Sequence, residues 1–431
     1  MYKYLPVIFL LLMVQSCKTP SGIFVKKTEH DQYGDKIDQA GLRQTELGNA
    51  WFTAAEKAIA NALPVQLPYK ENGYFAAERI DAAGFRFQAT RGEQITIRLS
   101  KIPVNNYRLF GDLFIVAAGA PKLIKSIDSV NSQLQYTAKE TSTFIVRLQP
   151  ELLKSGSYMI EISTGPSLGF PVPSPGAKNK VISFWGAGRD NGSRSHEGID
   201  IGGNRGTPLI AIGDGYVSRV TNNNLGGKVV FIHSETGDES WYYAHLDSQL
   251  VYNGQKVKAG DTIGLMGNTG NAITTAPHLH FGIYTRSGAV DPFPYINPEK
   301  KSAKPVTAPT ILLGRRMRIT GKTPLYFTPD LNQKEDGTEN LPVLLTAATQ
   351  QFYKAVLPGG ETRFVASANI EPLEKSIKQI TVKQDVRLTD SPLMDSPVID
   401  TLTAGTRIDL LGQYKEYQYV KAENHYGWIS R

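Results

Sequence analysis

The most constraining feature of this chain is a set of histidine and aspartate residues in three short motifs. His196 and Asp200 lie in SHEGIDIGG, His245 lies in WYYAHLDS, and His278 and His280 lie in APHLHFGIY. Nitrogen and oxygen ligands of this kind are those that Zn²⁺ prefers, and three of them can hold the ion while a fourth position stays open for water. The sequence therefore predicts a metal site with hydrolytic chemistry, and the fold must bring these separated motifs together.

The residues around the last motif predict a β-strand. The HLH triplet is followed by Phe281, Ile283 and Tyr284, which are typical strand residues. Because side chains alternate across a strand, His278 and His280 are expected to share one face. The same alternation is expected to place Trp241, Tyr243 and His245 on one face of a second strand.

The HEGID motif resembles the helical HExxH signature of zinc proteases only in part. Its second ligand is Asp200 rather than histidine, and Gly198 and the Gly202-Gly203 pair favour a loop that enters a strand. We therefore expect His196 on a loop and Asp200 at the start of a strand.

A simpler interpretation assigns these residues no metal. A single His-x-His pair is often two polar residues on an exposed strand, and an aspartate beside glycines is usually part of a turn. Five of the seven histidines, however, fall between residues 196 and 280. This concentration favours the metal site.

The motifs, in this order, resemble those of the lysostaphin-type zinc metallopeptidases, which cut peptide cross-links in peptidoglycan. The resemblance covers residues 182–291 and includes GDGYVSRV, GGKVVFIH and VKAGDTIGLMGNTG. It implies a compact, mostly antiparallel β fold with zinc in a groove. It also implies that His196, Asp200 and His280 bind Zn²⁺ and that His245 and His278 are the catalytic pair. None of the five positions departs from the family pattern, which argues against the zinc-free relatives that activate other cell-wall hydrolases.

The chemistry of amide hydrolysis is consistent with this assignment. Zn²⁺ lowers the pKa of a bound water to about 7. Two further groups are needed, one to take and return a proton and one to stabilise the oxyanion. His245 and His278 are the available pair, and the sequence does not say which is the base.

Other polar residues near the motifs rank lower as catalytic groups. Glu197 is expected to be a solvated acid, and His233 a structural or surface residue. His30 and His425 lie in distant segments and are expected at the surface. Trp241 and Tyr243 have two interpretations, as walls of a substrate groove or as core residues, and large aromatic residues on strands favour the core.

The amino terminus predicts export. Lys3 precedes the apolar run VIFLLLMV, which is far shorter than the roughly 18 residues of a membrane span, and Ser16-Cys17 follows. Cys17 is the only cysteine of the chain, and its position resembles the lipobox of bacterial lipoproteins, where the cysteine carries the lipid. An ordinary secretory signal and an uncleaved anchor are the alternatives. We expect an exported envelope protein anchored to the membrane by a lipid on Cys17.

The rest of the chain predicts a mainly β, multidomain protein. An alanine-rich stretch at residues 42–63 favours a helix, and short alternating segments such as FRFQA, QITIRLS, LFIVAA, TFIVRLQ and YMIEIS favour a β-sandwich of unknown role. The predicted segments are a signal peptide (1–17), a tether and helical segment (18–64), a β-sandwich-like domain (65–164), a linker (165–180), an antiparallel β metallopeptidase domain with a zinc groove (181–298), a second linker (299–315) and two small barrels (316–372 and 380–431).

The two C-terminal segments form a weak internal repeat that resembles bacterial SH3-like modules, which in envelope proteins often bind cell-wall peptide. Four aromatic residues are candidates to line a peptide groove: Tyr353, Tyr419, Tyr426 and Trp428. The alternative is that they form the core of the small barrels, and we favour the core for Trp428.

Composition limits the partners. A hydrophobic content of 41% and a charged content of 20% are ordinary for a soluble globular chain. The net charge of +7 is small and dispersed, and no nucleic-acid-binding motif is present, so we expect no nucleic acid partner. The predicted function is a zinc metalloendopeptidase acting on peptidoglycan stem or cross-link peptides. The alternative is a non-enzymatic envelope lipoprotein that binds wall peptide or regulates another hydrolase.

Overall fold

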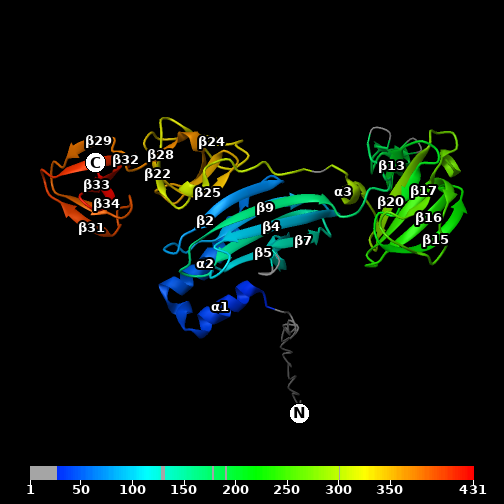
Figure 1. Ribbon diagram of the computed structural model, residues 1–431, viewed down its shortest axis with the longest axis horizontal. Helices are drawn as coiled ribbons and strands as arrows, with labels where there is room; N and C mark the ends of the chain where they lie inside the picture. Colours follow the sequence, from blue (N-terminus) through cyan, green and yellow to red (C-terminus); the bar gives the residue numbers. More distant parts are fainter. Residues whose placement is uncertain (1–26, 128–131, 177–178, 190–191, 300) are drawn as a thin grey trace, which may run out of the picture.

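The computed structural model describes residues 27–127, 132–176, 179–189, 192–299 and 301–431. The predicted signal peptide and Cys17 lie outside these residues. In the described ranges, no helix is both long enough and apolar enough to cross a membrane. Figure 1 shows a mainly β molecule in which three groups of strands follow one another along the longest axis.

Helices form the start of the described chain. Helix α1 spans Glu29–Gln39, a 3-10 turn spans Leu42–Gln44, and α2 spans Glu46–Ala60. Thr28 caps α1 in a reciprocal capping box with Asp31, and Thr45 caps α2. The helix predicted over 42–63 is confirmed as η1 and α2. A tether was also predicted, over residues 18–33 of the segment 18–64; this prediction is wrong from Glu29 onward, because the capping residues start a helix there.

Two sheets that share one core form the amino-terminal β structure. One has the order β1-β3-β8-β5-β6, and β2-β9-β4-β7 belongs to the other. The five predicted strand segments lie in β3, β4, β5, β8 and β9, whereas β2, β6 and β7 were not predicted. The bounds are β1 Leu63–Pro64, β2 Tyr69–Phe75, β3 Ala83–Ala89, β4 Glu93–Ile102, β5 Leu109–Ala117, β6 Ala120–Ile127, β7 Gln133–Thr137, β8 Ser142–Pro150 and β9 Gly156–Pro166.

His30 is a core residue and not the surface residue predicted from its isolation in the sequence. It is 6% exposed, and its ring stacks on Trp51 with centroids 4.5 Å apart. Its Nε2 lies 2.7 Å from Oε1 of Gln149. The capped helix α1 brings this histidine onto the sandwich, a long-range contact that its own sequence neighbourhood does not reveal.

A ten-stranded sheet carries the histidine motifs. Its main path is β10-β13-β20-β17-β16-β15-β18, and its pairs are antiparallel. Its elements and the flanking ones are β10 Val181–Ser183, β11 Gly188–Arg189, β12 Arg194–Ser195, β13 Ile199–Gly202, β14 Pro208–Ile210, β15 Gly215–Asn223, β16 Gly227–Ser234, β17 Glu239–Gln249, β18 Lys256–Val257, β19 Thr262–Met266, η3 Gly270–Ala272, β20 His278–Thr285, β21 Gly288–Val290 and α3 Phe293–Ile296.

The core of this sheet includes a residue from the segment predicted as the first linker. Val172 is 1% exposed and packs in the same cluster as the sheet residues. The backbone N–H of Leu168 donates to the carbonyl of Tyr295, and that of Gly169 donates to the carbonyl of Ile212. The chain between the sandwich and the sheet is therefore partly packed.

Two further groups of strands end the chain. The first group, strands β22–β28, is called the first C-terminal unit. It joins the sandwich, because β25 pairs with β2 and both belong to one eleven-stranded sheet. The second forms a six-stranded sheet. The bounds are η4 Thr310–Leu312, β22 Arg316–Ile319, β23 Pro324–Tyr326, β24 Lys334–Asp336, β25 Pro342–Thr349, β26 Phe352–Val356, β27 Thr362–Ala366, η5 Ser367–Asn369, β28 Ile370–Pro372, β29 Lys378–Thr381, β30 Val386–Thr389, β31 Val398–Leu402, β32 Arg407–Tyr414, β33 Tyr417–Ala422 and β34 His425–Ser430.

Three of the four aromatic candidates for a peptide groove in these units are core residues. Tyr353, Tyr419 and Trp428 are 0%, 8% and 1% exposed, so the groove interpretation is wrong for them. Tyr426 is 44% exposed. The resemblance of the two units to SH3-like modules stays a prediction.

Candidate metal centre

Two paired strands and the loop before them position the three predicted ligands. Asp200 on β13 is directly opposite His280 on β20. His196 lies in the loop between β12 and β13. A Cβ at Gly198 would lie 2.6 Å from the carbonyl oxygen of Phe281 and 2.8 Å from Cε1 of His280. The glycine therefore lets the loop pass close to β20, and the predicted loop and strand placements are confirmed.

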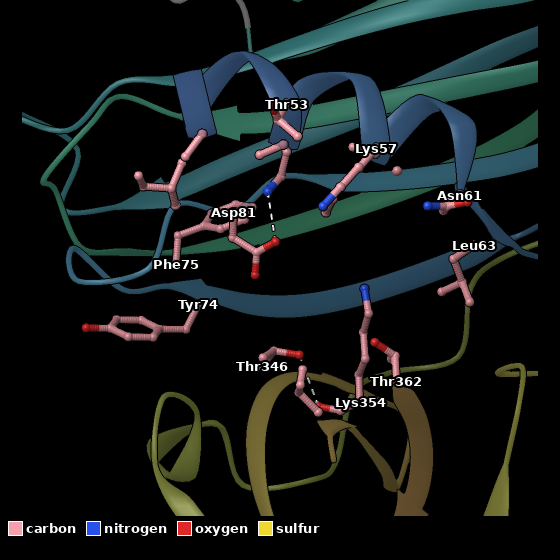
Figure 2. Close-up of a pocket in the computed structure, with 18 of the residues that line it drawn as sticks. Thr53, Lys57, Asn61, Leu63, Tyr74, Phe75, Asp81, Thr346, Lys354 and Thr362 are labelled. Atoms are coloured by element: carbon pink, nitrogen blue, oxygen red, sulfur yellow. Dashed lines mark hydrogen bonds between the residues drawn. The ribbon is translucent and has the colours of Figure 1, made fainter. Parts of the chain in front are cut away.

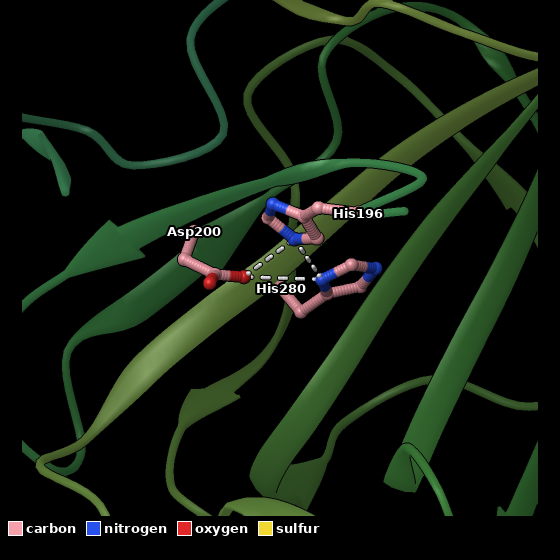
Figure 3. A group of neighbouring side chains, drawn as sticks. All are labelled: His196, Asp200 and His280. Carbon is pink, nitrogen blue, oxygen red and sulfur yellow. Dashed lines mark hydrogen bonds and ion pairs between the residues drawn. The ribbon is translucent and has the colours of Figure 1, made fainter. Parts of the chain in front are cut away.

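The three side chains present one ligand atom each toward a common point (Figure 3). Nε2 of His196 lies 2.9 Å from Nδ1 of His280, and Oδ1 of Asp200 lies 3.1 Å and 3.0 Å from these two nitrogens. Ligands about 2.05 Å from a tetrahedral Zn²⁺ would stand about 3.3 Å apart. Two nitrogens and one carboxylate oxygen at nearly this spacing fit the ion in number, chemistry and separation.

Hydrogen bonds outside the triad fix the protonation of His196. Its Nδ1 lies 3.0 Å from the carbonyl oxygen of Phe184, which can only accept. Nδ1 therefore carries the proton, and the lone pair of Nε2 faces the other two ligand atoms. His196 is 3% exposed, so the ring is held firmly.

Arg189 contacts the carboxylate from the outer side. Its Nη2 donates to Oδ2 of Asp200 at 2.6 Å and to Oγ of Ser183 at 2.8 Å. Burial opposes ionisation of Asp200, but its close contacts with His196 and His280 outweigh burial and hold the pKa of Asp200 below its usual value. Asp200 is therefore a carboxylate with Oδ1 directed at the ligand point and Oδ2 bound to a guanidinium.

His245 and His278 lie together beside the triad. Their ring centroids are 5.0 Å apart, and the ring of His245 is 6.0 Å from that of His280. Nδ1 of His245 is 2.8 Å from the carbonyl oxygen of Thr269, and Nδ1 of His278 is 2.9 Å from that of Ala276. Each carbonyl requires a proton on Nδ1, so each ring keeps an unprotonated Nε2 when neutral.

All five residues line one pocket of about 360 Å³. Burial lowers the pKa of His245 to about 4, so this ring is neutral at pH 7. The pocket also contains Arg189, Arg194, Leu225, Gly226, Tyr242, Ala244, Asn271, Ala272 and Thr275. The structure therefore brings the five predicted residues into one cavity large enough for part of a peptide.

A β-bulge corrects the predicted face of Trp241 and Tyr243. His245 has a φ of +63°, and the register of β17 against β16 shifts beyond Tyr243. Trp241 and Tyr243 are 1% and 0% exposed in the core, so they are not groove walls. Tyr242 lines the pocket instead. The extra residue at the bulge places His245 on the same side of the strand as Tyr242.

The lower-ranked residues contribute no ligand to the triad. Nδ1 of His233 is hydrogen-bonded to Oγ of Ser240 at 2.5 Å, consistent with the predicted structural role. The side chain of His425 is 57% exposed and lies 3.4 Å from the carboxylate of Asp400. Arg189 and Tyr242 were missed. The sequence offered no signal for either, because their positions depend on a hairpin and a bulge.

Comparisons with known proteins identify the segment that carries this site. Residues 194–292 match the family model described as Peptidase family M23, so the chain contains a lysostaphin-like peptidase domain of this family. The lipoprotein YgeR of Escherichia coli, itself uncharacterised, is 45% identical over 111 residues, which are 25% of this chain and 42% of that protein.

Two further relatives differ in their named activity. The peptidoglycan DD-endopeptidase ShyC of Vibrio cholerae is 33% identical over 36% of this chain and 31% of its own length. The murein hydrolase activator NlpD of Escherichia coli is 37% identical over 28% of this chain and 30% of its own length. The chain thus spans less than half of the length of these relatives. The solved catalytic domain of lysostaphin from Staphylococcus simulans is 34% identical, with a TM-score of 0.26, over 27% of this chain and 91% of that one.

Proposed function

We propose that this protein is a zinc metalloendopeptidase that hydrolyses peptide cross-links in bacterial peptidoglycan. The observation that carries the proposal is the convergence of His196, Asp200 and His280 on one point, beside two histidines that are outside the triad. The family match of residues 194–292 and the endopeptidase named among the relatives support the choice of substrate.

In this proposal the triad holds the ion and the histidine pair moves protons. Bound Zn²⁺ acts as a Lewis acid that activates water and polarises the substrate carbonyl. His245 and His278 each offer a free Nε2 at the pocket, because backbone carbonyls occupy their Nδ1 atoms. One can take the proton of the attacking water, and the other can stabilise the charge on the carbonyl oxygen or protonate the leaving amine.

The direct test is incubation of the zinc-loaded protein with purified sacculi, followed by mass spectrometry of the released fragments. New amino termini within cross-link peptides are expected from the wild type, and their position identifies the bond. The matched control is His233→Ala, which changes a histidine of the same sheet that lies outside the pocket. Release of no peptide fragment from any sacculus type, by a protein with one tightly bound zinc, would refute the proposal.

A regulatory function is the second candidate, because one relative is named a murein hydrolase activator. It predicts that the protein increases wall release by another hydrolase without cutting wall peptide itself. His245→Ala separates the two functions, since a regulator would keep its effect in this variant and an endopeptidase would lose it.

We also propose that the mature protein is anchored in the envelope by a lipid on Cys17. The short apolar run before a single cysteine supports this, and one relative is named a lipoprotein. Mass spectrometry of the mature chain is expected to find residue 17 as a lipidated amino terminus. An unmodified terminus at any other residue would contradict the proposal.

A further inference from the structure

A second cavity lies between α2, the sandwich and the first C-terminal unit (Figure 2). Its volume is about 650 Å³, within the range of small-ligand pockets, and it shares no lining residue with the histidine pocket. Helix α2 forms one wall, β2 crosses the middle, and the first C-terminal unit forms the opposite wall. We name this cavity the interunit cleft.

Both walls of the interunit cleft are fixed to the same sandwich. On one side, Trp51 of α2 donates from Nε1 to the carbonyl of Pro150 at 3.0 Å. A Cβ at Gly84 would lie 1.7 Å from the carbonyl oxygen of Ala58, which shows how closely α2 packs on β3. On the other side, β25 pairs with β2 through Asn72 and Gly73. The cleft is therefore already formed without a ligand, which lowers the cost of binding.

Two lysines from opposite walls direct their ammonium groups into the cleft. Figure 2 shows Lys57 of α2 and Lys354 of β26 extending toward one another. Neither forms an ion pair within the described part of the chain. Lys354 is half-buried, and its Nζ lies 5.6 Å from the ring centroid of Phe85. Lys57 is exposed, so water screens the repulsion between the two cations, and an anion that bridges them would interact with both.

The acidic residues of the cleft do not neutralise these lysines. Asp81 receives a hydrogen bond from Nη2 of Arg79 at 2.6 Å. Glu46 lies in the first turn of α2, where the helix N-terminus favours a carboxylate, and Lys57 lies in the last turn. The cationic end of the cleft is thus open to a ligand carboxylate.

The remaining lining groups suit a peptide chain. Asn61 and Thr362 near the lysines and Thr53 on α2 can hydrogen-bond backbone amides, while Leu63 and Tyr74 offer apolar surface. We propose that the interunit cleft binds a short acidic peptide whose carboxylates lie between Lys57 and Lys354. This site is independent of hydrolysis at the histidine pocket.

The test measures binding by fluorescence anisotropy with the full chain in the presence of a zinc chelator, so that cleavage cannot consume the probe. The probe is a labelled five-residue peptide with two glutamates, compared with the same peptide carrying glutamines. Lys57→Gln/Lys354→Gln is expected to raise the Kd of the glutamate peptide at least about tenfold, since two charge-assisted contacts are lost. The glutamine peptide is expected to bind the wild type as weakly as the glutamate peptide binds the double variant.

The matched control is Lys122→Gln/Lys383→Gln, which removes the same charge from exposed positions outside the cleft and should change the Kd less than twofold. Equal Kd values for the two lysine pairs, equal binding of the glutamate and glutamine peptides, or no wild-type binding at millimolar peptide would each overturn the proposal. A competition experiment with stem peptide isolated from sacculi identifies the source of the acidic peptide. If stem peptide competes more strongly than the unlabelled glutamate peptide, the ligand is wall peptide. If it competes more weakly, the ligand is a protein segment.

Discussion

Nη2 of Arg189 donates to Oδ2 of Asp200, while Oδ1 of the same carboxylate faces His196 and His280. The guanidinium therefore restrains the carboxylate so that a single oxygen points at the proposed zinc position. Partners of this kind orient a ligand and are typically worth 10- to 100-fold in metal affinity.

Removal of this contact is expected to weaken zinc binding. Arg189→Gln should raise the zinc Kd by about tenfold or more, because Asp200 can then rotate and loses a charged partner. Competition with a chromophoric chelator measures this without any turnover. Arg286→Gln, at an exposed position, is the control and should leave the Kd unchanged. An unchanged Kd in Arg189→Gln would mean that the contact does not position the carboxylate.

Two histidine substitutions should separate metal binding from turnover. His280→Ala removes one nitrogen of the triad and is expected to lose both zinc and activity. His245→Ala is expected to retain one zinc per chain and to lower kcat by at least about 10²-fold, since proton transfer contributes this much. Metal content is measured by atomic emission and turnover with soluble cross-linked peptide. Wild-type turnover in His245→Ala would refute its catalytic role.

Much of the metal site could be predicted from the sequence because Asp200 and His280 lie on strands and His196 lies on a loop marked by glycine. The two-residue spacing of His278 and His280 and the glycines around Asp200 determine strand and loop geometry locally. The face of Tyr243 could not be predicted, because one extra residue at a bulge reverses the alternation. Arg189 was missed because a hairpin, and not a repeat in the sequence, brings it to Asp200.

The fold shows the same division between local and long-range information. Alternation in FRFQA identified β3, where buried and exposed residues alternate, whereas TFIVRLQ lies in β8, which is buried on both faces. The pairing of β2 with β25 joins segments about 275 residues apart, and no local pattern in either strand indicates its partner. This pairing creates the interunit cleft, so the cleft too was beyond prediction from sequence.

The close approach at Gly198 gives a prediction on stability. Gly198→Ala would place a methyl group 2.6 Å from the carbonyl oxygen of Phe281, so the loop that carries His196 must shift. Overpacking of this kind costs about 1–3 kcal/mol, and zinc affinity should fall with it. Thermal unfolding and chelator competition are the measurements. Gly176→Ala, where a Cβ would meet no atom within 4 Å, is the control. Equal stability and zinc affinity in the two variants would show that the loop accommodates a methyl group.

The buried His30 gives a prediction on pH. Burial, reinforced by the charge of Arg147, lowers the pKa of His30 below its usual 6.5. Between the lowered pKa and 6.5 the unfolded chain binds one more proton than the folded chain, so the free energy of unfolding decreases as the pH falls through this window. The slope from one such group is at most about 1.4 kcal/mol per pH unit.

Thermal scans at pH 7.5 and 5.5 test this expectation by comparison with His30→Gln. The variant should be less stable than the wild type at pH 7.5, because it loses the stacking on Trp51. It should lose less stability than the wild type on acidification, because it has no imidazole to protonate. His425→Gln, which changes an exposed histidine, should follow the wild type at both pH values. Identical pH dependence in His30→Gln and the wild type would show that His30 does not contribute to acid destabilisation.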